Sequence, residues 1–246
     1  MAVYACSDLH GYLILYKKIK QFLKEDDIVY FLGDANDRGP EGWALIQAIY
    51  NNKQFRYISG NHEEMFAAAG RSWLESGLSP DDFCEFHTRP FRLIEKNGGV
   101  KTLTDWIRDG ANKEWLSKME ALPHYMVYTN KDNKKILLSH AGCTLYNDSA
   151  DNDSKLLIFD DLLYGREHIH DIWSDECPDN WIIVHGHTPI PSLKERLHVG
   201  SRRNIGAFWY ANNHKCCIDQ RTFTSEVACL LDLDTFETHL FTVIDM

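Results

Sequence analysis

Short apolar runs recur along the chain, and each of them ends in small or polar residues. Their length and their content of Val, Ile, Phe and Tyr predict buried β-strands. The five clearest runs cover residues 2–6, 28–32, 55–58, 135–139 and 181–185. The segments at their ends read SDLHG, GDANDRG, SGNHE, SHAG and HGHTP.

Helical patterns separate the first three strands. Residues 13–24 carry an apolar stripe with lysines on the opposite side, and residues 40–50 begin with a proline, which favours a helix start. This alternation predicts an α/β layered core whose functional loops lie beyond the strand ends. Residues 122–139 predict a hairpin that turns at NKDNK. Three more strands, consistent with a second sheet, are expected at 214–219, 227–233 and 238–244.

From about residue 65 to residue 120 the pattern is mostly helical and rich in aromatic residues. We expect these helices to form a cap inserted into the α/β core, with the tryptophans in core or cap packing. Residues 1–246 would then form a single domain, a length that can bury one sizeable core. The acidic residues 147–154 are expected to be a solvated loop.

Composition narrows the classes of protein. Hydrophobic residues make up 44% and charged residues 25% of the chain, which is typical of a globular protein. No apolar run reaches the roughly 20 residues that cross a bilayer, and no export signal is visible. The formal net charge of −10 provides no basic surface for nucleic acid or an anionic membrane. A phosphorylated substrate stays compatible, because bound metal ions can supply local positive charge.

The chain has seven cysteines and no CxxC spacing, which predicts a reducing, cytoplasmic setting and no zinc finger. The adjacent Cys216 and Cys217 could be redox-active. However, neighbouring residues of a strand point to opposite faces, and free cysteine is often buried. We therefore favour core packing for this pair.

The strand ends carry side chains that can bind a metal ion. Asp8 and His10 are two residues apart, so both point to the same side of an extended chain. His185 and His187 have the same spacing, and Gly186 between them allows a close backbone approach. Asp34, Asn61 and His140 each follow a strand. Carboxylate, imidazole and amide ligands together suit Mn, Fe or Zn, and five such strand ends indicate a metal site.

The order of these motifs resembles that of the calcineurin-like metallophosphoesterases. D-x-H-G begins at Asp8, G-D-x-x-D-R-G at Gly33, G-N-H-E at Gly60, H-A-G at His140 and G-H-T at Gly186. The DRG and GNHE forms are similar to those of small bacterial and bacteriophage serine/threonine protein phosphatases and of symmetrical diadenosine tetraphosphate hydrolases. The resemblance implies a four-layer α/β/β/α sandwich with two divalent metal ions, of which Mn is favoured over Fe or Zn.

The resemblance also implies the ligands and the reaction. Asp8 and His10 would bind the first ion, and Asp34 would bridge both ions. The second ion would be completed by Asn61, His140 and His187. Water bridging the ions would attack the phosphorus of a phosphomonoester directly, without a phosphoenzyme.

Three residues would complete the catalysis that the resemblance implies. His62 would protonate the leaving group, and Asp37 would orient His62 and favour its protonated form. Arg38 would bind phosphate oxygens through its planar guanidinium group. Substrate contacts are expected from Arg38, Asn61, His185 and Arg221.

Three segments leave alternatives open. A second phosphate-binding arginine is usual between the H-A-G and G-H-T motifs, but the WSDE segment at 173–176 offers none. Asn97, Gly98 and Gly99 are either a helix stop or a loop near the groove. Residues 218–222 read IDQRT where I-D-T-G is usual, so Arg221 is either an anion contact or a surface residue. The candidates for the second arginine are Arg166, Arg202 and Arg203.

The sequence therefore predicts a two-metal phosphatase, foremost a serine/threonine protein phosphatase. A dinucleoside polyphosphate hydrolase is the alternative within the enzymes, because it would share every catalytic residue. The remote alternative is a metal-binding regulatory protein that has lost catalysis. A protein without catalysis would not need to keep all of its catalytic residues. The presence of the full set therefore counts against this alternative: Asp34, Asp37, Arg38, Asn61 and His62. The expected partner is a phosphorylated protein or a small phosphoester or nucleotide.

Overall fold

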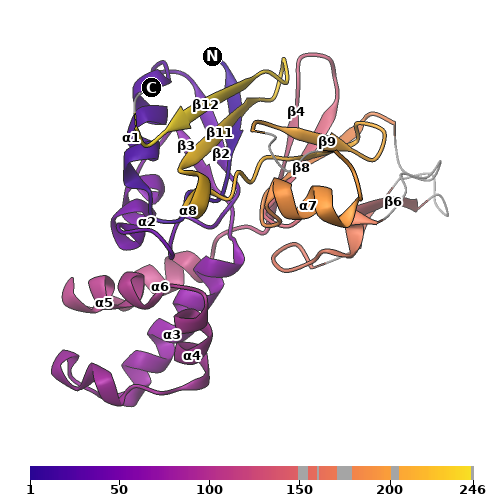
Figure 1. Cartoon of the computed structure of the whole chain (residues 1–246). Helices are drawn as coiled ribbons and strands as arrows, with labels where there is room; N and C mark the ends of the chain where they lie inside the picture. The colour runs from indigo at the N-terminus through magenta and orange to yellow at the C-terminus, as the bar shows by residue number, and fades with distance from the viewer. Residues whose placement is uncertain (149–154, 160, 171–178, 201–204, 245–246) are drawn as a thin grey trace.

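Two five-stranded sheets pack face to face in the computed structural model, which describes residues 1–148, 155–159, 161–170, 179–200 and 205–244 (Figure 1). The first sheet has the order β12 (Thr238–Thr242), β11 (Val227–Asp232), β1 (Val3–Cys6), β2 (Ile28–Phe31) and β3 (Phe55–Tyr57). The second has the order β4 (Tyr125–Thr129), β5 (Lys135–Ser139), β8 (Trp181–His185), β10 (Lys215–Cys217) and β9 (Phe208–Tyr210). β6 (Thr144–Asp148) and β7 (Lys155–Phe159) form a separate antiparallel pair.

The central strands of each sheet are parallel. β1 pairs in parallel with β2, and β2 with β3. In the second sheet β5, β8 and β10 are parallel neighbours. Loops that follow parallel strands emerge at the same edge of a sheet, and this arrangement determines where the functional side chains gather.

Side-chain alternation along the strands builds the layers. On β1, Val3 and Ala5 pack in the core between the sheets, whereas Tyr4 and Cys6 pack in a core that includes residues of α1 and α2. The helices of that layer are α1 (Leu13–Phe22) and α2 (Gly42–Tyr50). On the other side, α7 (Ile190–Arg196) and β10 share a small core through Leu193 and Cys217. The predicted α/β/β/α order is therefore confirmed.

A group of helices extends away from the sheets (Figure 1). It comprises α3 (Asn61–Ser76), the 3₁₀ helix η1 (Pro80–Glu85), α4 (Arg89–Lys96), α5 (Val100–Arg108) and α6 (Lys113–Glu120). The Phe66 ring lies 5.9 Å from that of Trp43 on α2 and 5.8 Å from that of Trp106. These aromatic contacts join the helices to the core under α2.

The strands near the C-terminus differ from the prediction that all three belong to a second sheet. The three final strands belong to both sheets: β10 lies in the second sheet, whereas β11 and β12 complete the first. β11 joins because it pairs antiparallel with β1, more than 200 residues away in the sequence. Residues 147 and 148 belong to β6 instead of a loop, and residues 149–154 lie outside the described residues. The short elements α8 (Thr222–Ser225) and η2 (Glu167–Ile169) complete the fold.

The cysteine pair packs as expected. Cys216 lies in the core between the sheets and Cys217 in the core under α7, so the two side chains leave the strand on opposite faces. Burial raises the pKa of both thiols well above the usual range, which leaves them unreactive. Within the described part of the chain, no helix has the length and hydropathy to cross a membrane.

Candidate active site

The strand-end motifs meet where the edges of the two sheets adjoin. They bring together Asp8 and His10 after β1, Asp34 after β2, Asn61 and His62 after β3, His140 after β5 and His187 after β8. We call these seven residues the strand-end cluster. Backbone hydrogen bonds tie the loops together: the Asp8 amide donates to the Gly33 carbonyl oxygen, and the His10 amide to that of Asp34.

Several residues at these strand ends have a left-handed backbone conformation. Such conformations cost about 1–3 kcal/mol each in residues other than glycine and persist only where surrounding contacts impose them. Their concentration here indicates a functional site. Positive φ angles occur at Asp8, His10, Asp34, Asp37, Arg38 and His187.

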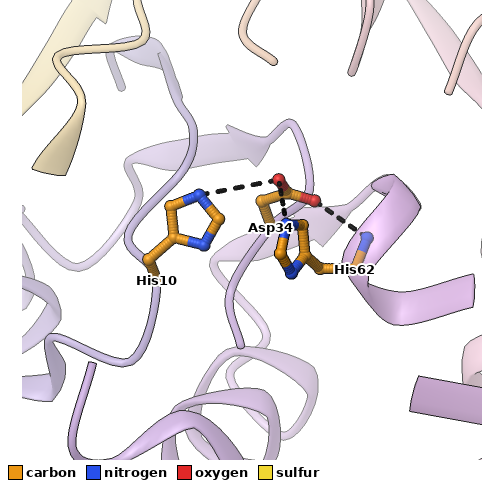
Figure 2. A group of neighbouring side chains, drawn as sticks. All are labelled: His10, Asp34 and His62. Atoms are coloured by element: carbon orange, nitrogen blue, oxygen red, sulfur yellow. Dashed lines mark hydrogen bonds and ion pairs between the residues drawn. The ribbon is translucent and has the colours of Figure 1, made fainter. Parts of the chain in front are cut away.

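Asp34 lies at the centre of the cluster, between His10 and His62 (Figure 2). Its Oδ2 atom is 3.6 Å from His10 Nε2 and 3.7 Å from His62 Nε2. Its Oδ1 atom is 3.3 Å from His140 Nε2 and accepts a hydrogen bond from the His62 amide. Asp8 Oδ1 lies 4.0 Å from His10 Nε2. The Asp34 carboxylate therefore faces His10 and His62 through one oxygen and His140 through the other.

The second half of the cluster combines residues from both sheets. The side-chain amide oxygen of Asn61, Oδ1, lies 2.9 Å from His140 Nε2 and 3.0 Å from His187 Nδ1. The two imidazole nitrogens are 3.2 Å apart. Asp8 accepts a hydrogen bond from the His187 amide, and a Cβ atom at Gly186 would lie 2.0 Å from Asp8 Oδ2. Only glycine fits beside this carboxylate.

The directions of the lone pairs fit bound cations. His140 Nδ1 donates to the Leu32 carbonyl oxygen and His10 Nδ1 to that of Asn36, so each Nε2 atom turns its lone pair into the cluster. The lone pair of His140 Nε2 faces two further acceptor atoms, Asn61 Oδ1 and Asp34 Oδ1, and no proton lies between them. His187 turns Nδ1 to the same place, 3.0 Å from Asn61 Oδ1. Nitrogen and oxygen donors that converge in this way fit divalent metal ions.

Burial shifts the pKa values of the carboxyl groups and the imidazoles in opposite directions, in each case toward the uncharged form. Desolvation raises the pKa of Asp8 and Asp34 well above the usual range, and each carboxylate is also repelled by a neighbouring one. Burial lowers the pKa of His140 to about 3 and also lowers the pKa of His10 and of His187. The cluster thus holds buried carboxyl groups beside neutral imidazoles, and divalent cations would supply the compensating charge.

His62 forms a pair with Asp37 beside the cluster. Asp37 Oδ2 lies 2.7 Å from His62 Nδ1, and both side chains are fully buried. Asn36 fixes the same carboxylate, because its Nδ2 atom donates to Asp37 Oδ1. Arg38 donates to His10 Nε2 at 2.7 Å and to His62 Nε2 at 2.9 Å. The His62 ring therefore keeps its Nδ1 proton toward Asp37 and turns Nε2 toward the cluster.

The family model Metallophos, described as calcineurin-like phosphoesterase, matches residues 1–218. The chain belongs to this family. The recognition made from the strand-end motifs is confirmed, since the match includes every residue of the strand-end cluster.

Two curated relatives of this chain are named for different substrates. The chain is 29% identical over 153 residues to serine/threonine-protein phosphatase 2 of Escherichia coli (strain K12), and the match covers 56% of this chain and 57% of that protein. The chain is 27% identical over 149 residues to the symmetrical bis(5'-nucleosyl)-tetraphosphatase of Buchnera aphidicola subsp. Schizaphis graminum (strain Sg), and the match covers 58% of this chain and 45% of that protein. The chain spans about half the length of these relatives.

Solved structures agree on the fold. A metallophosphoesterase from Sphaerobacter thermophilus superposes with a TM-score of 0.53 at 13% identity, covering 100% of this chain and 89% of that one. At this identity the likeness supports the architecture alone.

Glu63 is a site residue to which the sequence pattern assigned no role. Its buried carboxylate accepts hydrogen bonds from the backbone amides of Asp34, Ala35 and Gly60 and from the Tyr57 hydroxyl. It therefore fixes the loop after β2 against the start of α3. The GNHE motif contained the signal, because a glutamate three residues after a helix N-cap forms a capping box.

The segment 97–99 supports the site from the helical side. The Gly98 carbonyl oxygen accepts the Arg38 amide at 2.9 Å. A Cβ atom at Gly99 would lie 2.6 Å from Asp37 Oδ1. The Asp37 amide also donates to the hydroxyl oxygen of Thr102 on α5. The loop thus both ends α4 and holds Asp37 and Arg38 in place.

A cavity of about 260 Å³ opens beside the cluster. Arg166, one of the candidates for a second phosphate-binding arginine, lies in its wall together with Arg38. Arg202, Arg203 and the segment 173–176 lie outside the described residues, as does Cys177. The remaining walls are Asp34, Asn61, Met65, Leu93, Asn97, Tyr164 and His187.

Neither His185 nor Arg221, the other two expected substrate contacts, is among the residues that line this cavity. His185 is fully buried, and its ring nitrogens contact the Gly186 carbonyl oxygen and the Tyr210 hydroxyl, so neither nitrogen faces the cavity. It points away because it is the last residue of β8, where side chains alternate between the faces of the sheet. Arg221 is exposed, and its guanidinium lies 5.6 Å from the ring centroid of Phe223.

Proposed function

We propose that this protein is a two-metal phosphoesterase that hydrolyses phosphomonoesters, with phosphoserine and phosphothreonine in proteins as its main substrates. One observation carries the proposal: the convergent lone pairs, the His62–Asp37 pair and Arg38 all face one place. Metal binding, acid catalysis and phosphate binding would thus act on a single phosphoryl group.

Two metal ions would be held by the chain's own nitrogen and oxygen donors. Asp8, His10 and Asp34 would hold one ion, with Asp34 shared between the two. The other would be completed by Asn61, His140 and His187. Such ions, when bound, polarise phosphoryl oxygens and lower the pKa of water. We propose Mn as the metal, with Fe and Zn compatible with the same donor set.

The side chains supply substrate binding and proton transfer. Arg38 would turn its guanidinium fork to two phosphoryl oxygens, and Arg166 would bind from the other wall of the cavity. His62 would donate a proton from Nε2 to the leaving oxygen. Its Nδ1–H···Asp37 hydrogen bond, at 2.7 Å, holds the ring in the required orientation.

The helical segment from about 65 to 120 would act as a cap within a single domain. Met65, Leu93 and Asn97 from this segment line the cavity. They could therefore contact the part of the substrate beyond the phosphoryl group. The cysteines that the structure describes are free thiols, compatible with the cytoplasmic location that we propose.

A dinucleoside polyphosphate hydrolase is the second candidate. It is favoured by the 27% identity to a symmetrical bis(5'-nucleosyl)-tetraphosphatase, which is close to the identity with the protein phosphatase. Both activities would use the same cluster and would differ in the walls of the cavity.

The test is kcat/KM for a phosphothreonine peptide and for diadenosine tetraphosphate, measured with Mn on one preparation. The proposal predicts a clear preference for the peptide. A preference for the dinucleotide would support the second candidate, and turnover of neither would contradict both.

A further inference from the structure

Phe223 lies beside the proposed phosphate-binding arginine, on the short helix α8 directly after the segment 218–222 that departs from the family's late motif. The guanidinium carbon of Arg38 lies 4.5 Å from the centroid of the Phe223 ring. The same ring packs edge-on against His10, with centroids 5.7 Å apart. A guanidinium at this distance over an aromatic face forms a cation–π contact.

Hydrogen bonds fix the backbone on either side of Phe223. α8 connects β10 of the second sheet to β11 of the first, so both of its ends are anchored in strands. The buried hydroxyl of Thr222 donates to the Val227 carbonyl oxygen, and the Arg221 amide donates to Asp219. Arg221 and Glu226, on either side of the helix, have positive φ angles. Such conformations persist where surrounding contacts impose them.

The backbone of Arg38 is fixed independently of Phe223. Its amide donates to the Gly98 carbonyl oxygen in the loop after α4, and its φ angle is 64°. The side chain is exposed, so its guanidinium group would otherwise sample many rotamers. A change at position 223 should therefore alter the guanidinium position while leaving the loop after β2 unchanged.

The polar partners of Arg38 are only available in the absence of metal and substrate. His10 Nε2 accepts from Arg38 here, but this lone pair would be used by a metal ion. His62 Nε2 would carry the proton for the leaving group and could no longer accept. The Phe223 ring, whose centroid also lies 5.6 Å from the Arg221 guanidinium, would bind neither a metal ion nor a proton, so its contact with Arg38 can persist throughout the reaction.

We propose that Phe223 is a positioning residue that holds the Arg38 guanidinium toward the phosphoryl group. This inference rests on the proposed phosphoesterase function. It gives Phe223 a role in phosphate affinity, whereas the sequence alone raised such a role only for the neighbouring Arg221.

The test measures binding of inorganic phosphate to Mn-loaded protein by calorimetry, without turnover. Phe223→Leu, which keeps apolar bulk but removes the aromatic face, should weaken phosphate binding roughly three- to fivefold. Phe223→Tyr, which retains the face, should bind like wild type. Phe22→Leu is the matched control, because Phe22 packs against Tyr4 and Phe241.

A double-mutant cycle separates positioning from a structural effect. In the Arg38→Ala background, Phe223→Leu should cause no further loss of phosphate affinity. An equal loss in both backgrounds, or unchanged affinity in the single variant, would overturn the inference. If Phe223→Leu fails to fold, Phe223→Met replaces it in the same cycle. Wild-type protein that binds no phosphate would overturn the proposed function as well. Failure of the function and failure of the inference alone therefore give different results.

Discussion

Asp34 lies among three imidazoles of the cluster. Its two oxygens lie within 3.7 Å of ring nitrogens of His10, His62 and His140. Replacement by asparagine keeps the shape but removes the charge that both metal ions would share. The amide would keep one oxygen acceptor and turn the other position into an NH₂ donor, which would weaken the binding of both ions.

We therefore expect Asp34→Asn to lose metal and activity together. Turnover should fall more than about 100-fold, beyond the range usual for an outer-shell partner, and bound metal should decrease in elemental analysis. Asp81→Asn changes an exposed carboxylate on η1 and should have no effect. Full activity with two bound metal ions in Asp34→Asn would refute the bridging role.

His62 should affect proton transfer and spare the metal ions. His62→Asn is expected to retain both ions and to slow esters with poor leaving groups by about 100-fold or more. Aryl esters with good leaving groups need less protonation and should be slowed much less. His87→Asn, at an exposed site, is the control. An equal loss on both kinds of ester would show that His62 is not the general acid.

At the scale of elements, α3 and the loop after β2 depend on Glu63. Glu63→Gln would place an amide NH₂ group against backbone N–H groups that now donate to a carboxylate. We expect the variant to lose about 2–3 kcal/mol of unfolding free energy in urea titrations, because buried donors lose their acceptor. Glu75→Gln, exposed on the same helix, should change stability by less than about 0.5 kcal/mol. Equal stability of the two variants would contradict this role.

Many elements were predictable because their signals are local. The buried strands β1, β2, β5 and β8 show as apolar runs, and α1 and α2 as helical stripes. β9 was not predicted, since its three residues are too short for a periodic pattern. The sheet membership of β11 was also missed, because it depends on pairing with β1 at the far end of the chain.

At the scale of the whole molecule, the packing of two sheets builds the site. Asp8 and Asp34 come from the first sheet, and His140 and His187 from the second. The order of motifs identified these residues, but distances between them follow from packing that no single segment encodes. His185 illustrates the limit: its spacing matched that of a ligand, yet its side chain turns into the core beside Tyr210.

The buried polar residues behind the site should make stability depend on pH. His168 contacts Tyr210 through Nδ1, and burial lowers the pKa of His168 to about 2. Below pH 6.5 the unfolded chain binds a proton here that the folded chain does not, so stability falls as pH falls.

His168→Gln should therefore flatten this dependence. As the pH falls from 6.5 to 4.5, the unfolding free energy of the metal-free variant should decline less steeply than that of metal-free wild type. The two slopes should differ by up to about 1.4 kcal/mol per pH unit. His170→Gln, at an exposed position, is the control and should follow the wild-type curve. Parallel curves for His168→Gln and wild type would exclude this contribution.

The central claim is that the strand-end cluster binds two metal ions and thereby hydrolyses phosphomonoesters. The most direct test strips the protein of metal, restores Mn stepwise, and measures bound Mn and p-nitrophenyl phosphate turnover in the same samples. We predict two Mn ions per chain, with turnover that appears on reconstitution and is lost on chelation. Equal turnover in the stripped protein, or none with two ions bound, would contradict the account.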